Sequence, residues 1–273
     1  DGSSGDDTTI DADFINFGSL IAGGNMSLTA GDISGGDLEA ANLVTVLSGG
    51  DVTLDTVTAG GSVNLTSNTG LINMGDISTN EIALSGGDLT IEANGQVSLG
   101  TVEGAGVIDV DAGGIDFGGL SASENIRLAI NSDVVGDFLD AGEDIFVANF
   151  GDATIDDISA GDEVTMRIRG DLQVDTLTAG SNVSLVIDGS LEILTDTQVG
   201  GVISARAFAV LINSQGGMVF DRIYAADGDL EVNGGGGTVQ ADDVQSAGDI
   251  LITNQGDIVL GSVEAGIGVF SDS

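Results

Sequence analysis

The sequence predicts an all-β fold, a right-handed parallel β-helix (solenoid) of roughly a dozen coils with about 19 residues per coil. Three observations predict it: a 19-residue repeat, apolar side chains that alternate with a period of two, and an unusual composition. The 273 residues include 45 glycines and no proline, and only 4% are aromatic. Valine, isoleucine, leucine and alanine therefore supply most of the candidate core, which is typical of strands.

The repeat is clearest in the middle of the chain. Four consecutive units begin at Ala122, Ala141, Ala160 and Ala179, at a constant spacing along the chain. The unit that starts at Ala160 reads AGDEVTMRIRGDLQVDTLT. A fixed period of this length is typical of solenoid proteins. Looser copies extend the pattern over nearly the whole chain, with insertions at 79–119 and 195–237.

Within one unit, each element follows from its residues. After the Ala-Gly turn, Val164, Met166 and Ile168 alternate with polar residues and predict a strand. A Gly-Asp turn follows, and Leu172 and Val174 begin a second alternating strand. We expect glycine in the turns because it tolerates positive φ, and aspartate because its side chain accepts local hydrogen bonds.

A single coil cannot bury its apolar face alone, so the coils are expected to stack through parallel strands. Crossover connections between parallel strands favour the right-handed sense. We expect a polar N-terminal segment at 1–9 and one solenoid at 10–273, with uncapped half-coils at both ends that would let subunits stack head to tail. A β-propeller or sandwich and a nine-residue calcium repeat are less consistent with the 19-residue period.

Charge and missing residue types narrow the function. The chain has 44 acidic residues and five basic residues, and its net charge of −39 excludes nucleic acid as a partner. No segment is apolar over the roughly 20 residues needed for membrane insertion. The chain lacks lysine, histidine, cysteine and tryptophan, and its acids recur in repeat columns. We therefore expect no enzyme activity and no required cofactor, with a polysaccharide-active β-helix enzyme as a minor alternative.

The unit from Ala160 to Thr178 resembles the repeats of filamentous haemagglutinin-like exoproteins of two-partner secretion and of autotransporter-type surface adhesins. This resemblance implies an extracellular or cell-surface protein of a bacterium or archaeon, exported with a signal that has since been removed. It implies a structural or adhesive fibre segment that associates with itself or with surface and matrix partners. The alternative is the shaft of a larger adhesin that binds glycans or proteins.

Two columns of aspartates recur on the outside of the predicted coils. Asp133, Asp152 and Asp171 form one column, and Asp137, Asp156 and Asp175 form the other four residues later. Carboxylates about 5 Å apart repel one another, and calcium favours clustered carboxylate oxygens. The columns are therefore candidate Ca²⁺ sites, and a solvated acidic face is the alternative.

A second outward cluster is arginine-rich and aromatic. Its residues are Arg127, Phe146, Phe150, Arg167 and Arg169. Phe150 and Arg169 occupy equivalent positions one coil apart, which permits a cation–π contact. Aromatic and arginine side chains are common anchors of interfaces, so we expect a lateral contact with another subunit, an acidic partner or a glycan. Local charge neutralisation or packing beneath a loop would explain the cluster equally.

Overall fold

The fold is a parallel β-solenoid of about 13 turns with about 19 residues per turn, as the sequence predicts. The computed structural model describes residues 2–74, 81–84, 87–266 and 269–272. These residues form strands and short turns, and none of them belongs to a helix that could cross a membrane. The chain divides into two compact units, Asp1–Gly142 and Glu143–Ser273, where the sequence predicts a single solenoid.

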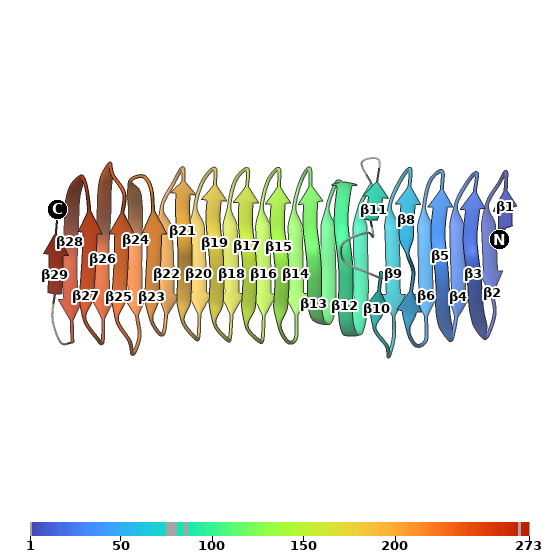
Figure 1. Cartoon of the computed structure of the whole chain (residues 1–273), viewed down its shortest axis with the longest axis horizontal. Coiled ribbons are helices and arrows are strands. Elements are labelled where there is room, and N and C mark those ends of the chain that lie inside the picture. Colours follow the sequence, from blue (N-terminus) through green and yellow to red (C-terminus); the bar gives the residue numbers. More distant parts are fainter. Residues whose placement is uncertain (1, 75–80, 85–86, 267–268, 273) are drawn as a thin grey trace. The chain divides into compact units, whose positions relative to one another are not determined.

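Within its described residues, the first unit contains fifteen strands that stack side by side (Figure 1). They are β1 (Gly2–Ser4), β2 (Thr8–Asp11), β3 (Phe14–Ala22), β4 (Met26–Ala30), β5 (Asp32–Ala40), β6 (Val44–Ser48), β7 (Val52–Thr53), β8 (Thr56–Ala59), β9 (Val63–Ser67), β10 (Ile72–Asn73), β11 (Glu81–Leu84), β12 (Leu89–Ala105), β13 (Ile108–Ala122), β14 (Ile126–Ile130) and β15 (Val134–Ala141).

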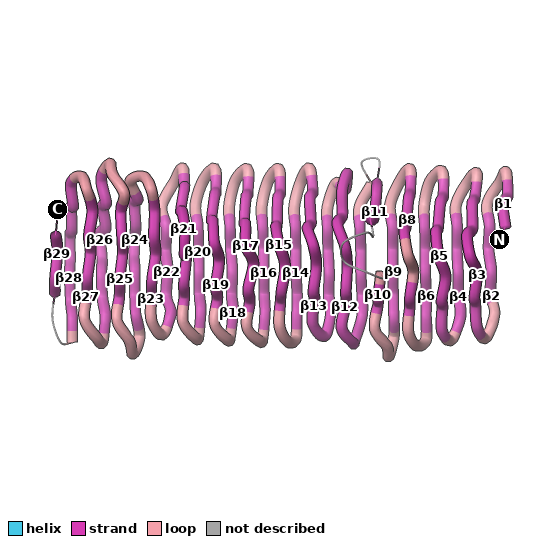
Figure 2. The backbone as a smooth tube through the Cα atoms, in the orientation of Figure 1, coloured by secondary structure: helices cyan, strands magenta, loops and turns pink. Residues whose placement is uncertain are grey.

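Within its described residues, the second unit contains fourteen strands of the same kind, and short turns join those from β16 to β28 (Figure 2). They are β16 (Ile145–Asn149), β17 (Ala153–Ala160), β18 (Val164–Ile168), β19 (Leu172–Ala179), β20 (Val183–Ile187), β21 (Leu191–Val199), β22 (Ile203–Ala207), β23 (Val210–Ser214), β24 (Met218–Ala225), β25 (Leu230–Gly234), β26 (Thr238–Ser246), β27 (Ile250–Asn254), β28 (Asp257–Ala265) and β29 (Val269–Asp272).

Strand register confirms the 19-residue repeat. Ala122 pairs with Ala141 in the first unit, and Ala160 pairs with Ala179 in the second. Because each strand pairs in parallel with its equivalent one coil later, identical positions form straight ladders. The alternating residues therefore point inward together in every coil.

The inward ladders form the core of each unit. In β18, Val164, Met166 and Ile168 are each at most 1% exposed, while Arg167 between them is exposed. Full burial of such a side chain stabilises the fold by about 1.5–3 kcal/mol. The core thus grows by the same increment with every coil that is added.

At several turn glycines, the backbone of a neighbouring coil comes too close to leave room for a side chain, whereas the sequence predicts positive φ at the turns. Among the described residues, Gly237 alone has a positive φ, of 74°. At Gly180, an added Cβ would strike the carbonyl oxygen of Gly161 in the preceding coil, and at Gly60 it would strike that of Ala41. The Ala-Gly signature therefore marks the point where stacked turns come closest.

The irregular stretch at 195–237 lets long and short strands exchange columns. From β16 to β22, the five-residue strands β16, β18, β20 and β22 pair with one another in order. The short strands β22 and β23 then follow one another, and β22 pairs with the eight-residue strand β24 through a register shift. The insertion predicted here is thus a displacement of the repeat by half a coil.

The solenoid also begins earlier than the sequence predicts. Residues 2–4 form β1, which pairs in parallel with β3, and residues 8–11 form β2, which pairs with β4. The polar segment expected at 1–9 therefore contributes strands to the first coil. Serine and threonine fill the outward positions of these strands without interrupting the backbone ladder.

Candidate functional site: corner aspartates and an arginine face

Aspartates at the corners hold one coil to the next. Asp152 accepts a hydrogen bond through Oδ1 from the backbone N–H of Asp171 at 2.9 Å, and Asp171 accepts one from the N–H of Ser190 at 2.7 Å. The same contact joins Asp32 to the N–H of Asp51 at 3.0 Å in the first unit. Each acceptor immediately precedes the first buried residue of a strand.

The corner contact is a general feature of the coils. It recurs at Asp7, Asn25, Asp88, Asp144, Asn182 and Asp229. Backbone N–H groups at turns need an acceptor, and these side chains supply it. Since asparagine takes the position twice, the contact requires an oxygen acceptor and not a negative charge.

The predicted aspartate columns therefore differ in role. Asp152 and Asp171 hold the corner, and Asp133 stands in the corresponding position before Val134. Asp156 and Asp175 are exposed on the neighbouring strands β17 and β19, and Asp137 is exposed on β15 in the first unit. Within the described ranges, no group of three or more acidic side chains lies close enough to hold a metal ion. Calcium binding stays a prediction.

Asp196 is the carboxylate with the most distinctive surroundings. Burial alone would raise its pKa, but hydrogen bonds outweigh that effect and lower the pKa from its usual 3.8. The donors are the backbone N–H of Gln215 at 2.8 Å, the side-chain amide of Gln198 at 2.7 Å and the N–H of Thr197 at 2.9 Å, with the Ser214 hydroxyl nearby. Asp196 lies where the long and short strands begin to exchange columns, so its hydrogen bonds stabilise the displaced coil.

The arginine-rich cluster becomes an ordered surface in the second unit. We define the arginine face as the outward side chains of β16, β18, β20 and β22, the residue after each of these strands, and Tyr224 on β24. One row of paired positions runs through Ala148, Arg167, Val186, Arg206 and Tyr224. Since neighbouring strands lie about 4.8 Å apart, Arg167 and Arg206 are about 10 Å apart along this row.

A parallel row at the edge of the face contains the predicted cation–π pair. The guanidinium carbon of Arg169 lies 4.1 Å from the centre of the Phe150 ring, which confirms the contact expected from the alignment. Phe208, the residue after β22, lies at the same edge, where its backbone N–H donates to the carbonyl oxygen of Gly189. Phe150 and Phe208 are 52% and 46% exposed, so part of each aromatic side chain is open to solvent. A second, longer contact places Arg206 over Tyr224 at 6.0 Å.

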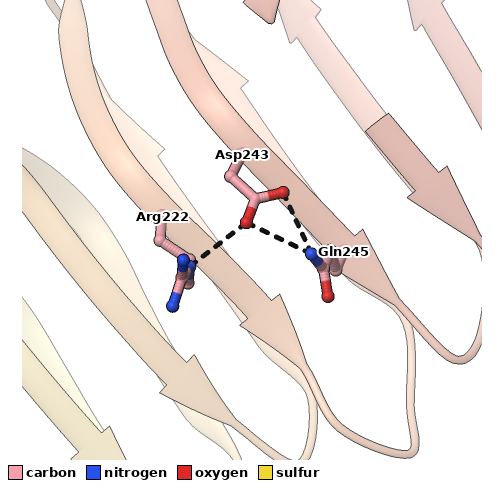
Figure 3. Close-up of polar contacts among 3 residues, drawn as sticks. All are labelled: Arg222, Asp243 and Gln245. Carbon is pink, nitrogen blue, oxygen red and sulfur yellow. Dashed lines mark hydrogen bonds and ion pairs between the residues drawn. The ribbon is translucent and has the colours of Figure 1, made fainter. Parts of the chain in front are cut away.

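The remaining arginines have acidic partners. Arg127, predicted to belong to the cluster, lies on β14 in the first unit and donates to Asp109 at 2.6 Å. Arg222 on β24 donates to Asp243 on β26 at 3.2 Å, and the amide of Gln245 contacts the same carboxylate (Figure 3). Ion pairing therefore neutralises both of these guanidinium groups.

The arginine face has an unusual charge for this chain. Its described side chains include Arg167, Arg169 and Arg206 but a single acid, Asp188, so its formal charge is +2. None of these three arginines is within 4.0 Å of a carboxylate among the residues that the structure describes. By contrast, the outward positions of β17, β19 and β21 carry five acids and no arginine.

Sequence alignment of the regular units misses Arg206, Phe208 and Tyr224. They follow Val199, where the 19-residue period is lost, and the place of Tyr224 on the face depends on the exchange of strand columns. The spacing from Val186 to Arg206, slightly longer than the regular repeat, is the sequence signal that could have found them. Phe146 lies on the same face beside Thr165, as part of the row that continues through Ser184 and Ser204.

The two features differ in what they can do chemically. The corner aspartates accept hydrogen bonds from backbone N–H groups, whereas the arginine face exposes charged donors and aromatic side chains to solvent. Comparison of the chain with protein-family models, with curated proteins and with solved structures finds no match.

Proposed function

We propose that the chain is a structural or adhesive segment of an extracellular fibre. The observation that carries the proposal is the repetition of one coil with the same corner contact, as at Asp152 and Asp171. In a solenoid of this kind, each coil presents the same outward positions, and the stability of the fold increases with the number of stacked coils. This architecture suits a scaffold, and the haemagglutinin-like character of the repeat supports a cell-surface location.

The acidic surface is consistent with this role. A net charge of −39 keeps a protein soluble and limits nonspecific association. Self-association of such a chain requires either screening by salt or cations that bridge carboxylates. We therefore propose that fibre formation, by head-to-tail stacking of coils, depends on ionic strength or calcium.

The shaft of a larger adhesin is a second candidate, and the arginine face favours it. Arginine and aromatic side chains are frequent anchors of binding surfaces. A purely passive spacer has no need for three arginines, without a carboxylate partner in the described part of the chain, on one face of an acidic protein. In this version the fibre segment both spans distance and contacts a partner.

Electron microscopy of the purified protein at several concentrations, with calcium and with chelator, tests the proposal. Filaments that lengthen with protein concentration would support a fibre segment, and short rods at every concentration would favour the shaft version. Gold-labelled antibodies on intact cells that produce the protein test its location. Label confined to the cell interior would contradict both versions.

A further inference from the structure

We propose that the arginine face binds a linear, carboxylated polysaccharide that lies across strands β16, β18, β20 and β22. The inference deepens the adhesive role proposed above, because it names the chemistry of the partner. These four strands are neighbours in the second unit (Figure 1), so one extended ligand can contact all of them.

The spacing of the arginines fits a polyuronate. Arg167 and Arg206 share one row and are separated by Val186 on β20, which makes their distance about 10 Å. In an extended β-1,4-linked chain, carboxylates on the same side recur at every second sugar, and this disaccharide has nearly the same length. Each arginine can then donate to one carboxylate, in the bidentate geometry that guanidinium groups favour.

The aromatic side chains supply platforms for the sugar rings. Phe150 and Phe208 lie on the edge row of the face, and both are about half exposed. Arg169 stacks on Phe150, so the edge of its planar guanidinium group presents N–H donors beside an apolar surface. Sugars combine apolar ring faces with hydroxyl acceptors, and this arrangement matches both.

The charge of the arginine face and its border favours a polymer of low charge density over a nucleic acid. The face carries a formal charge of +2, but acidic corners such as Asp144 and Glu163 border it. At physiological salt, charges beyond the Debye length of about 8 Å are largely screened, so the nearby arginines dominate. A nucleic acid places a phosphate at every nucleotide and would bring several charges against the acidic corners. A polyuronate presents only one carboxylate per disaccharide to the protein, so its other charges stay away from the acidic corners.

The test uses a hexamer of β-1,4-linked mannuronate as the probe, and a hexamer of β-1,4-linked mannose as its neutral match. Isothermal titration with the full chain, in chelator to prevent calcium bridging, compares low salt, about 150 mM NaCl, with high salt, about 1 M NaCl. We expect the mannuronate hexamer to bind at low salt and weakly or not at all at high salt. We expect the mannose hexamer to bind at least tenfold more weakly.

Arginine substitutions test whether the polysaccharide binds to the arginine face. Arg167→Gln and Arg206→Gln are exposed changes and are each expected to weaken binding by about tenfold or more. The matched control is Arg127→Gln, whose guanidinium already pairs with Asp109 in the other unit, and it should leave affinity unchanged. Circular dichroism verifies that each variant is folded.

Three results would overturn the inference: no binding of mannuronate at low salt, equal binding of mannose, or an equal loss in Arg127→Gln. Sedimentation without ligand distinguishes another occupant. If Arg167→Gln and Arg206→Gln dissociate an oligomer, the face contacts a second copy of the chain and not a polysaccharide. The filament and location experiments are independent of this titration. Absence of polysaccharide binding would therefore leave the fibre proposal untouched, and absence of filaments would leave the polysaccharide inference untouched.

Discussion

Gly136 on β15 gives the sharpest test of how the coils pack. Its partner one coil earlier is Phe117 on β13, one of the largest fully buried side chains and 1% exposed. The ring of Phe117 lies over the glycine, so the Cβ of an alanine at 136 would overlap the ring atoms Cε2 and Cζ. Because the ring is enclosed, it has no exposed position to which it can move.

The magnitude follows from two opposing effects. An alanine in an unstrained strand normally stabilises a protein relative to glycine by about 0.4–1 kcal/mol, since the unfolded chain loses freedom. Overfilling a packed core costs about 1–3 kcal/mol. We therefore expect Gly136→Ala to lower the free energy of unfolding by about 1–2 kcal/mol, with the steric effect dominant.

Urea denaturation followed by circular dichroism measures the change. Phe117→Leu removes Cε2 and Cζ, the two ring atoms nearest to the added Cβ, so Gly136→Ala should cost less in the Phe117→Leu background than in the wild type. A coupling of about 1 kcal/mol or more is expected from a double-mutant cycle. Gly216→Ala is the matched control, because an added Cβ there meets no atom within 4 Å. The packing argument fails if Gly136→Ala is as stable as Gly216→Ala, or if the two changes are additive.

Three further predictions follow from the corner contacts and the charge. Asp171→Ala should lower the free energy of unfolding by about 1 kcal/mol, because the N–H of Ser190 loses its acceptor. Asp171→Asn keeps an acceptor and should be as stable as the wild type, or more stable at low salt. Equal melting temperatures for Asp171→Ala and Asp171→Asn would contradict the acceptor role. The pKa of Asp196 is lowered in the fold, so its contribution to stability is present above its unfolded value of 3.8 and is lost as pH falls below that value. The stability difference between wild type and Asp196→Asn should therefore shrink below about pH 4, and a difference that is independent of pH in thermal melts would refute this assignment. Screening of the acidic surface should raise the melting temperature as the NaCl concentration increases. If calcium binds at the aspartate columns, CaCl₂ should raise the melting temperature more than NaCl at equal ionic strength. An identical rise with both salts would contradict calcium binding and favour a solvated acidic face.

Local sequence was sufficient for the coil because the fold repeats the same short-range rule. Val164, Met166 and Ile168 alternate, and each must point inward wherever strands stack in register. The 19-residue step from Ala160 to Ala179 then determines which residues pair. The contact between Phe150 and Arg169 was predictable for the same reason, since equivalent positions in neighbouring coils are adjacent.

The roles of glycine and aspartate were harder to predict. Gly180 stands in a turn, where positive φ is the usual explanation, but the carbonyl oxygen that excludes a side chain belongs to another coil. The repeating column of Asp171 predicts a calcium site, which stays a prediction, but the repeat did not indicate that its oxygen accepts a backbone N–H from the next turn. In both cases the side chain or glycine is explained by a backbone atom of a neighbouring coil. Sequence patterns do not show which backbone atoms come close to one another.

The sequence by itself determined the period, the strand composition, the inward and outward faces, and the excess of negative charge. Those properties depend on residue type and spacing, which the hydrophobic effect and strand geometry convert directly into structure. Tertiary structure alone decided that long and short strands exchange columns after β22, and thereby brought Tyr224 beside Arg206. A displacement of half a coil leaves local alternation intact, so only the hydrogen-bonded register between coils reveals which outward side chains share a face.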